Sequence, residues 1–152
     1  MKYGGCDNLE SIASPTSMSF KNSADLVIYF GYCTSLSSIP SDLFKYCTNV
    51  VNFAGTFRGC TSLSNILADL FKYCTNVESF AETFSGCTNL TGQAIPLWER
   101  MENGATYNYE SGYDINNDII RGPEGFGCYS YCTGLTNYSS IPEYWKSLPV
   151  NQ

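Results

Sequence analysis

The sequence predicts one right-handed α/β solenoid, whose 27-residue coils carry short parallel strands and short helical turns. Two observations support this fold class. Segments 33–59 and 60–86 align without gaps, and 20 of their 27 positions are identical. No single unit can enclose its own Leu, Ile and Phe side chains, so each unit must bury them against its neighbours. The 152 residues suit a single domain with a sizeable core.

The repeat divides residues 1–152 into the units of one domain, with a cysteine column setting the register. In chain order, the units span 6–32, 33–59, 60–86, 87–131 and 132–152. The fourth unit contains an insertion at about residues 105–127, because 45 residues instead of 27 separate Cys87 from Cys132. The last unit is shortened, and we expect it to be a C-terminal partial unit or cap.

Each coil contains two half-motifs, C-x-x-L-x-x-I-P-x-x-L-F-x-x-C and T-N-V-x-x-F-x-x-T-F-x-G-C. In unit 33–59 the first strand is expected near Leu36 and Ile39, and the second near Val50 and Phe53. A single helical turn follows each strand. Parallel strands of successive coils would then lie about 4.8 Å apart.

Two polar columns recur at the same period and are candidates for structural ladders. The asparagine column consists of Asn22, Asn49, Asn76 and Asn103. These amides could be buried and bond the next coil, or they could be exposed turn residues that tolerate a left-handed conformation. The cysteine column consists of Cys6, Cys33, Cys60 and Cys87.

The eight cysteines could be bridged between coils or could remain free thiols. A second column, in which Cys47 and Cys74 align with Phe20 and Met101, accepts any mid-sized apolar side chain. This pattern favours buried thiols that fill the core. The spacings do not supply the C-x-x-C pairs of zinc ribbons, so we expect no metal and no cofactor.

Composition argues against catalysis and against two classes of partner. The chain has no histidine, which excludes Ser-His and Cys-His nucleophile pairs and the common zinc motifs. The net charge is -6 and the Lys and Arg residues are scattered, so nucleic acid is not an expected ligand. No apolar run is long enough to span a membrane. We therefore expect a protein that is not an enzyme.

Candidate binding residues lie in the insertion and on the expected strands. The insertion is rich in Tyr, Asn and Gly, a composition typical of paratopes, although it could instead cap the last coil or be a plain linker. Its candidate contacts are Tyr107, Asn108, Tyr109 and Tyr113. On the strands, exposed polar positions that differ between units are candidates for specificity: Ser37, Ser38, Asn52, Ser64, Asn65, Glu78 and Ser79.

The run C-x-x-L-x-x-I-P and the junction F-x-G-C-T-x-L resemble the BspA-like leucine-rich repeats and a related repeat family of mycoplasma surface proteins. The resemblance covers about residues 3–103 and resumes at Tyr129. It implies a leucine-rich-repeat-like fold and an adhesion or recognition role on a bacterial or phage surface, with a protein or glycan as ligand. The corresponding location is extracellular, on the cell surface or on the virion.

A second hypothesis is an intracellular inhibitor or decoy, such as a phage-encoded one, that is located in the cytoplasm. It would suit free thiols and an N-terminus without the apolar core of a signal peptide. The first unit also begins in the middle of a half-motif, and an exposed coil edge favours pairing. We therefore expect end-to-end self-association or flanking repeats.

Overall fold

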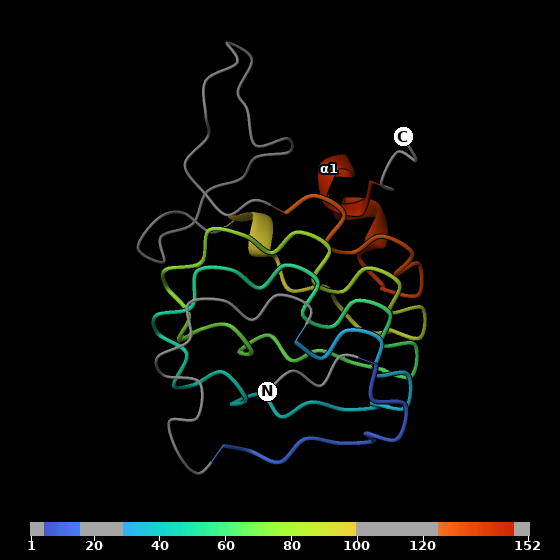
Figure 1. Ribbon diagram of the computed structural model, residues 1–152. Coiled ribbons are helices and arrows are strands. Elements are labelled where there is room, and N and C mark those ends of the chain that lie inside the picture. The colour runs from blue at the N-terminus through green and yellow to red at the C-terminus, as the bar shows by residue number, and fades with distance from the viewer. Residues whose placement is uncertain (1–4, 16–28, 100–124, 148–152) are drawn as a thin grey trace.

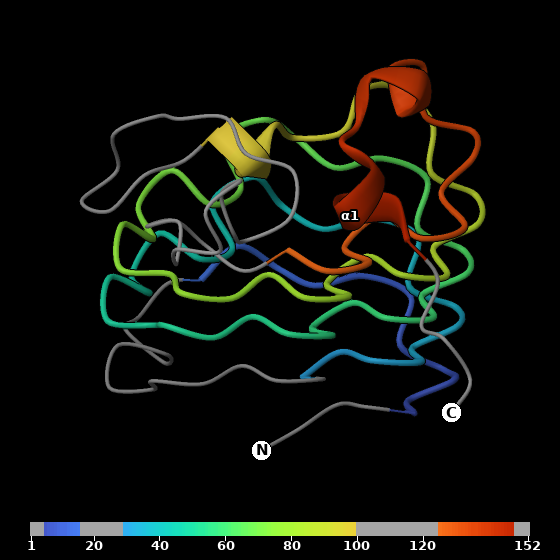
Figure 2. The same cartoon turned by 90° about the horizontal axis from the view of Figure 1, so that it is seen from above.

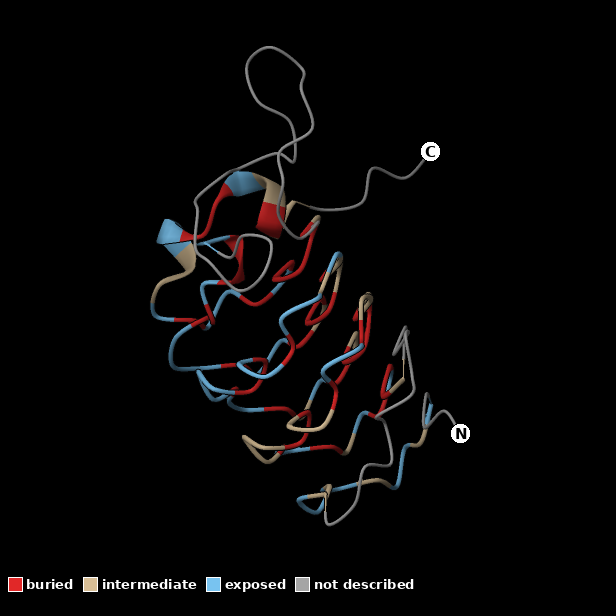
Figure 3. Cartoon of the chain, turned by 90° about the vertical axis from the view of Figure 1, so that its left-hand side faces the viewer, coloured by how far each residue is buried: buried red, intermediate tan, exposed pale blue. Residues whose placement is uncertain are grey.

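The computed structural model describes residues 5–15, 29–99 and 125–147, and it shows them as coils stacked on one another (Figures 1 and 3). Backbone hydrogen bonds join equivalent positions of successive coils. The amide of Ser37 donates to the carbonyl oxygen of Glu10 at 3.0 Å, and the amide of Phe57 donates to the carbonyl oxygen of Thr83 at 2.9 Å. The 27-residue period of the sequence is therefore the length of one coil.

The expected α/β class, with parallel strands and helical turns in every coil, is wrong. The described residues contain no sheet, and their only strand-like pairings are isolated parallel bridges between Ser11 and Ser38 and between Asn52 and Ser79. The helices with defined bounds are the 3₁₀ helices η1 (Leu97–Glu99) and η3 (Tyr138–Ser140) and the short α-helix α1 (Glu143–Lys146). Most of each coil consists of consecutive tight turns.

Alternate amides explain why the coils do not become strands. In the second half-motif, the amides of Phe53, Gly55, Phe57 and Gly59 donate to carbonyls of the next coil. The amides of Thr56, Arg58 and Cys60 donate instead to the carbonyl three residues earlier, as Arg58 does to Gly55 at 3.0 Å. The Ala54 amide donates to the side-chain oxygen of Asn52. Because every second step closes a turn, no extended run is long enough to form a ladder.

A left-handed backbone conformation recurs immediately before each cysteine of the main column. The residues with positive φ at this position are Gly5, Tyr32, Gly59, Gly86 and Tyr131. A second such column, inside the F-A-G-T-F motif, contains Gly55, Glu82 and Gly127. Glycine adopts this conformation without steric cost, whereas tyrosine and glutamate do not. The turn geometry is thus conserved between coils even where the residue is not glycine.

Stacked aromatic rings form much of the core. The rings of Phe30, Phe57, Phe84 and Tyr129 follow one another with centroid separations of 5.4, 5.6 and 5.7 Å. Parallel stacks join Phe44 to Phe71 at 5.6 Å and Phe53 to Phe80 at 5.9 Å. In Figure 3, buried segments recur in the successive coils that follow the first one. The Phe columns of the sequence are therefore continuous ring stacks, in which each coil contacts its neighbours.

The C-terminal end closes the stack with two tryptophans. Figures 1 and 2 show η1 and α1 at the same end of the stack. Trp98 of η1 and Trp145 of α1 are both buried and meet edge to face, with ring centroids 6.1 Å apart. Gly125 occupies the column of Phe53 and Phe80, and a Cβ added there would lie 2.1 Å from the Trp145 ring. The indole thus fills the space that a phenylalanine fills in the preceding coils.

The repeat geometry resumes before the end of the expected insertion 105–127. The amide of Glu82 donates to the carbonyl oxygen of Phe126 at 2.8 Å, and the amide of Phe84 donates to the carbonyl oxygen of Cys128 at 2.9 Å. These bonds repeat the pattern between the two preceding coils, so residues 125–131 complete the fourth coil. Residues 100–124 lie outside the described part of the chain.

Candidate functional site

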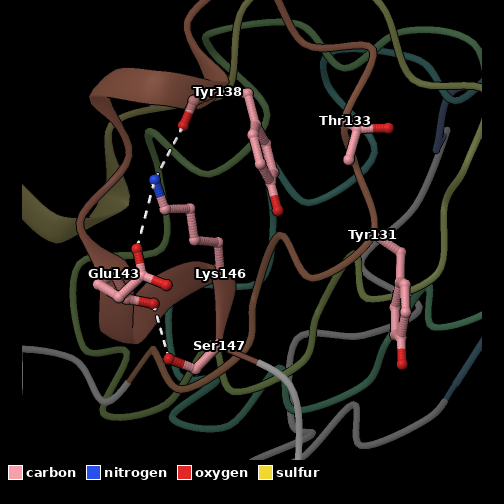
Figure 4. A pocket seen from close by; sticks show the side chains of 6 residues that line it. All are labelled: Tyr131, Thr133, Tyr138, Glu143, Lys146 and Ser147. Atoms are coloured by element: carbon pink, nitrogen blue, oxygen red, sulfur yellow. Dashed lines mark hydrogen bonds and ion pairs between the residues drawn. The ribbon is translucent and has the colours of Figure 1, made fainter.

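A surface pocket of about 370 Å³ lies at the C-terminal end of the stack (Figure 4). The residues that line it are Tyr131, Thr133, Tyr138, Glu143, Lys146 and Ser147. Four of these six side chains carry hydroxyl groups. Figure 4 shows Tyr131 and Thr133 on one side of the pocket and Lys146 and Glu143 on the other. The volume is at the lower end of the range of small-molecule sites, about 300–1,000 Å³.

Three local structures position these side chains. Tyr131 stands in the left-handed column at φ 66°, and its neighbour Cys132 is anchored in the core. Tyr138 begins η3, where the amide of Ile141 returns to the Tyr138 carbonyl at 3.2 Å. Glu143 and Lys146 belong to α1, which is held against the stack by the buried Trp145. The pocket is therefore built on residues that are fixed by the core.

The charges within the pocket compensate one another. The Lys146 ammonium lies 3.6 Å from the Glu143 carboxylate, 3.5 Å from the Tyr138 carbonyl oxygen and 5.3 Å from the centroid of the Tyr138 ring. The Lys146 side chain is 16% exposed. Partial burial, with smaller contributions from Cys132 and Glu143, raises the pKa of the Tyr138 phenol. The phenol is therefore neutral at physiological pH and can both donate and accept hydrogen bonds.

Tyr131 also borders a strip of bare backbone formed by Gly59 and Gly86. These glycines precede Cys60 and Cys87 in the left-handed column. In the same column Tyr32 comes before Gly59, and Tyr131 comes after Gly86. The Tyr32 ring covers Gly59, since a Cβ added to Gly59 would lie 2.5 Å from its Cδ1 atom. A Cβ added to Gly86 would meet only backbone atoms of Gly59, at 3.6 Å. We call this surface the glycine strip; its two tyrosines are 48% and 52% exposed.

Two of the serines predicted to confer specificity form hydrogen bonds between coils. The hydroxyl groups of Ser37 and Ser64 lie 3.3 and 3.4 Å from the carbonyls of Glu10 and Ser37. Thr91 and Thr136 continue the same column, with bonds of 3.1 and 2.9 Å. Ser37 and Ser64 therefore have a structural use, although both are exposed.

The other predicted positions fall into three groups. Asn52 and Ser79 accept bonds from the amides two residues later, at 2.9 and 3.2 Å, and so shape their own turns. Ser38, Asn65 and Glu78 are exposed, and their side chains bond no described residue. Tyr107, Asn108, Tyr109 and Tyr113 lie outside the described residues. The structure does not gather the described candidates into one pocket.

The asparagine column is described at two of its four positions. The Asn76 amide donates to the Thr48 carbonyl of the preceding coil at 2.8 Å, yet Asn76 and Asn49 are exposed. Asn76 thus combines the inter-coil bond of a ladder with the exposure of a turn residue. Asn22 and Asn103 are not among the described residues.

The cysteine column forms a ladder of thiol hydrogen bonds. All eight cysteines are unbridged. The thiols of Cys60, Cys87 and Cys132 each lie 3.1 Å from a carbonyl oxygen of the preceding coil, on Phe30, Phe57 and Phe84. Burial raises the pKa of Cys60 and Cys132 to about 12, and that of Cys87 well above its ordinary value. Cys6, at the first position, is only half-buried.

Sequence reasoning missed Tyr131, Tyr138 and Lys146 as pocket residues. One signal was available: Tyr32 and Tyr131 interrupt a column that is otherwise glycine at Gly5, Gly59 and Gly86. An aromatic residue in a turn position that favours glycine points to a surface role. No comparable feature of the sequence indicated that η3 and α1 line the same pocket.

The described residues contain no cluster of three or more His, Cys, Asp or Glu side chains that could hold a metal ion. Within the same part of the chain, no helix has the length and apolar character needed to cross a bilayer.

Comparisons with known proteins yield a similarity of structure but not of sequence. No protein family and no curated protein matches the sequence. The structure is similar to the crystal structure of a T. pallidum leucine-rich repeat protein, with a TM-score of 0.25 and 16% identity over 83% of this chain and 67% of that chain. At this TM-score the likeness carries no argument about fold or function.

Proposed function

We propose that this protein is a non-catalytic binding module whose ligand contacts the pocket at the C-terminal end of the stack. The observation that supports this most is the arrangement of Tyr131, Tyr138 and the Lys146–Glu143 pair around one open pocket. Exposed rings beside a few fixed polar groups are typical of recognition sites. The rigid core beneath them reduces the entropy lost on binding.

The reactive groups of the described chain support binding over catalysis. Thiolates are the nucleophilic form of cysteine, and burial raises the pKa of Cys47, Cys60 and Cys132 to about 12. These thiols are therefore protonated at neutral pH. The Ser147 hydroxyl of the pocket donates to the Glu143 carbonyl at 2.8 Å and not to the Glu143 carboxylate, so this carboxylate does not activate it.

The BspA-like motifs of the sequence support adhesion at a bacterial or phage surface as the biological setting. The C-x-x-L-x-x-I-P run contributes Leu36 and Ile39 to the core, and the F-x-G-C junction contributes the turn and the thiol of each coil. The unbridged thiols favour a second candidate, an inhibitor or decoy in a reducing compartment. Both candidates require a surface that recognises a partner.

Capture experiments with the full chain test this proposal. The immobilised protein is incubated with intact bacterial cells, intact animal cells and the cytosol of each. We expect capture from intact surfaces that is lost in Tyr131→Gly and retained in Tyr73→Ala. Tyr73 is a suitable control because it is 44% exposed but does not line the pocket. Capture from cytosol alone would support the inhibitor, and no capture from any source would contradict a binding module.

A third variant addresses the predicted insertion contacts separately. Replacing residues 105–122 with a short Gly-Ser linker removes Tyr107, Asn108, Tyr109 and Tyr113 and leaves Gly125 and Phe126 in place. Loss of capture in this variant, with capture intact in Tyr131→Gly, would move the proposed site from the pocket to the insertion.

A further inference from the structure

We infer that the pocket and the adjoining glycine strip bind a neutral oligosaccharide, an inference that rests on the proposed binding function. Two exposed tyrosine rings, four hydroxyl side chains and a compensated ion pair occur together on this surface. Each of these features restricts the chemistry of the ligand in a different way.

The charges favour a neutral ligand. Lys146 is the only cation of the lining, and its ammonium is already held by Glu143 and by the Tyr138 carbonyl. An anionic ligand would have to displace Glu143 and approach a chain with a net charge of -6. A cationic ligand would have to compete with Lys146 for the Glu143 carboxylate. A ligand without charge leaves the ion pair intact.

The aromatic and hydroxyl groups favour a sugar over a peptide. The Tyr131 ring is half-exposed, whereas one face of the Tyr138 ring is occupied by Lys146. Tyr131 can therefore accept the apolar C–H face of a sugar ring. The hydroxyls of Thr133 and Tyr138 can donate to and accept from sugar hydroxyls. Peptide hot spots instead lie in desolvated pockets, whereas this pocket is open to solvent.

The glycine strip extends the site beyond one sugar. Tyr32 and Tyr131 are three coils apart in the column, but the Tyr32 ring leans over Gly59. One glycine, Gly86, therefore lies in the column between the position that the Tyr32 ring covers and Tyr131. The surface between them is backbone at Gly86, where no side chain lies within 4 Å of an added Cβ. A short oligosaccharide can cross this strip and stack on both rings.

Binding is tested on a printed array of neutral, sialylated and sulfated oligosaccharides, followed by calorimetric titration with the neutral series that binds. Tyr131→Gly is expected to weaken binding at least tenfold for every chain length. Tyr32→Gly is expected to weaken only the longer oligosaccharides. Both substitutions install the residue found at Gly59 and Gly86, so the turn is retained. Tyr73→Ala should bind like the unmodified protein.

The outcomes separate this inference from the proposed function. Binding of acidic sugars alone, or neutral binding that is unchanged in Tyr131→Gly, would overturn the oligosaccharide site. Cell-surface capture is repeated after periodate oxidation under conditions strong enough to cleave the vicinal diols of neutral sugar rings. Capture that survives periodate but is lost in Tyr131→Gly would retain the binding module and reject the sugar. Capture that is absent from all cells would reject both.

Discussion

Glu82 adopts a left-handed backbone conformation, with φ 54°, at a position held by Gly55 and Gly127 in the neighbouring coils. Its carboxylate pairs with Arg58 at 2.7 Å, although both side chains are partly exposed. Pairs of this kind contribute about 0–1 kcal/mol, comparable to the cost of holding a side chain in this conformation. The ion pair thus offsets local strain and adds little net stability.

Substitutions at Glu82 separate the two effects. Ala and Gly both remove the ion pair, but only Ala keeps a Cβ in the left-handed region. We expect Glu82→Gly to be more stable than Glu82→Ala by about 1 kcal/mol in urea unfolding. At Glu78, which has no positive φ, the same two substitutions should rank in the opposite order by roughly 0.5–1 kcal/mol. If the Ala and Gly variants ranked in the same order at Glu82 and Glu78, the backbone strain inferred at Glu82 would be contradicted.

Gly125 tests whether the Trp145 indole replaces a missing phenylalanine. A methyl group at Gly125 would overlap the ring, so Gly125→Ala should destabilise the protein by about 1–3 kcal/mol or more in urea unfolding. The smaller ring of Trp145→Phe relieves the overlap. The double variant Gly125→Ala/Trp145→Phe should therefore lose less stability than the sum of the single variants. Strict additivity would show that the two positions are not coupled.

The thiol ladder is an element whose contribution depends on pH. Burial raises the pKa of Cys47, Cys60 and Cys132 to about 12 in the folded protein, above the ordinary thiol value of 9.0 that the unfolded chain keeps. Below pH 9 both states are protonated and the full stability is present. Above it only the unfolded state loses protons, so stability falls as pH rises towards 12.

Urea unfolding in reductant at pH 8, 9 and 10 measures this loss. Each buried thiol should contribute up to about 1.4 kcal/mol per pH unit above pH 9. Cys60→Ala should unfold more easily at pH 8 but show a shallower pH slope, because one titrating group is gone. A slope identical to that of the unmodified protein would mean that Cys60 does not titrate on unfolding.

The aromatic stack that joins the coils is a second element with a testable contribution. The rings of Phe57 and Phe84 are nearly parallel, and their centroids are 5.6 Å apart. Because a stacked pair adds about 0.5–1.5 kcal/mol beyond burial, the double variant Phe57→Leu/Phe84→Leu should lose less stability than the sum of the single variants, by roughly that amount. Chemical denaturation of the single and double variants measures this coupling. Strict additivity would mean that the rings act through burial alone.

At the scale of the whole molecule, the period of the coil could be predicted and its secondary structure could not. The Cys, Leu and Phe columns specify which side chains meet, and Cys60, Leu63 and Phe57 are fully buried. The same columns do not specify how the backbone travels between them. Turns that use every second amide satisfy the same apolar spacing as a strand followed by a helical turn. The strand and helix assignments therefore failed although the core columns are buried.

The pocket was less predictable than the core because it depends on contacts between distant segments. Tyr131 ends the fourth unit and Tyr138 comes from the shortened last unit, whereas Lys146 comes from α1, whose Trp145 fills the place left by Gly125. Variation between otherwise similar units directed attention to Ser37 and Ser64. Their hydroxyls bond the neighbouring coil, so an exposed polar position in a repeat is not by itself evidence of a ligand contact.

The column that contains Tyr32, Gly59, Gly86 and Tyr131 sets the distance between the two tyrosine rings by the number of coils. Each coil adds one fixed step, about 4.8 Å, between the two rings. Duplicating residues 60–86 would insert another glycine between them and lengthen the interval by one step. Deleting the unit would shorten it by the same amount. Changes in repeat number would then alter the length of ligand that spans both rings, without any change in the residues that contact it.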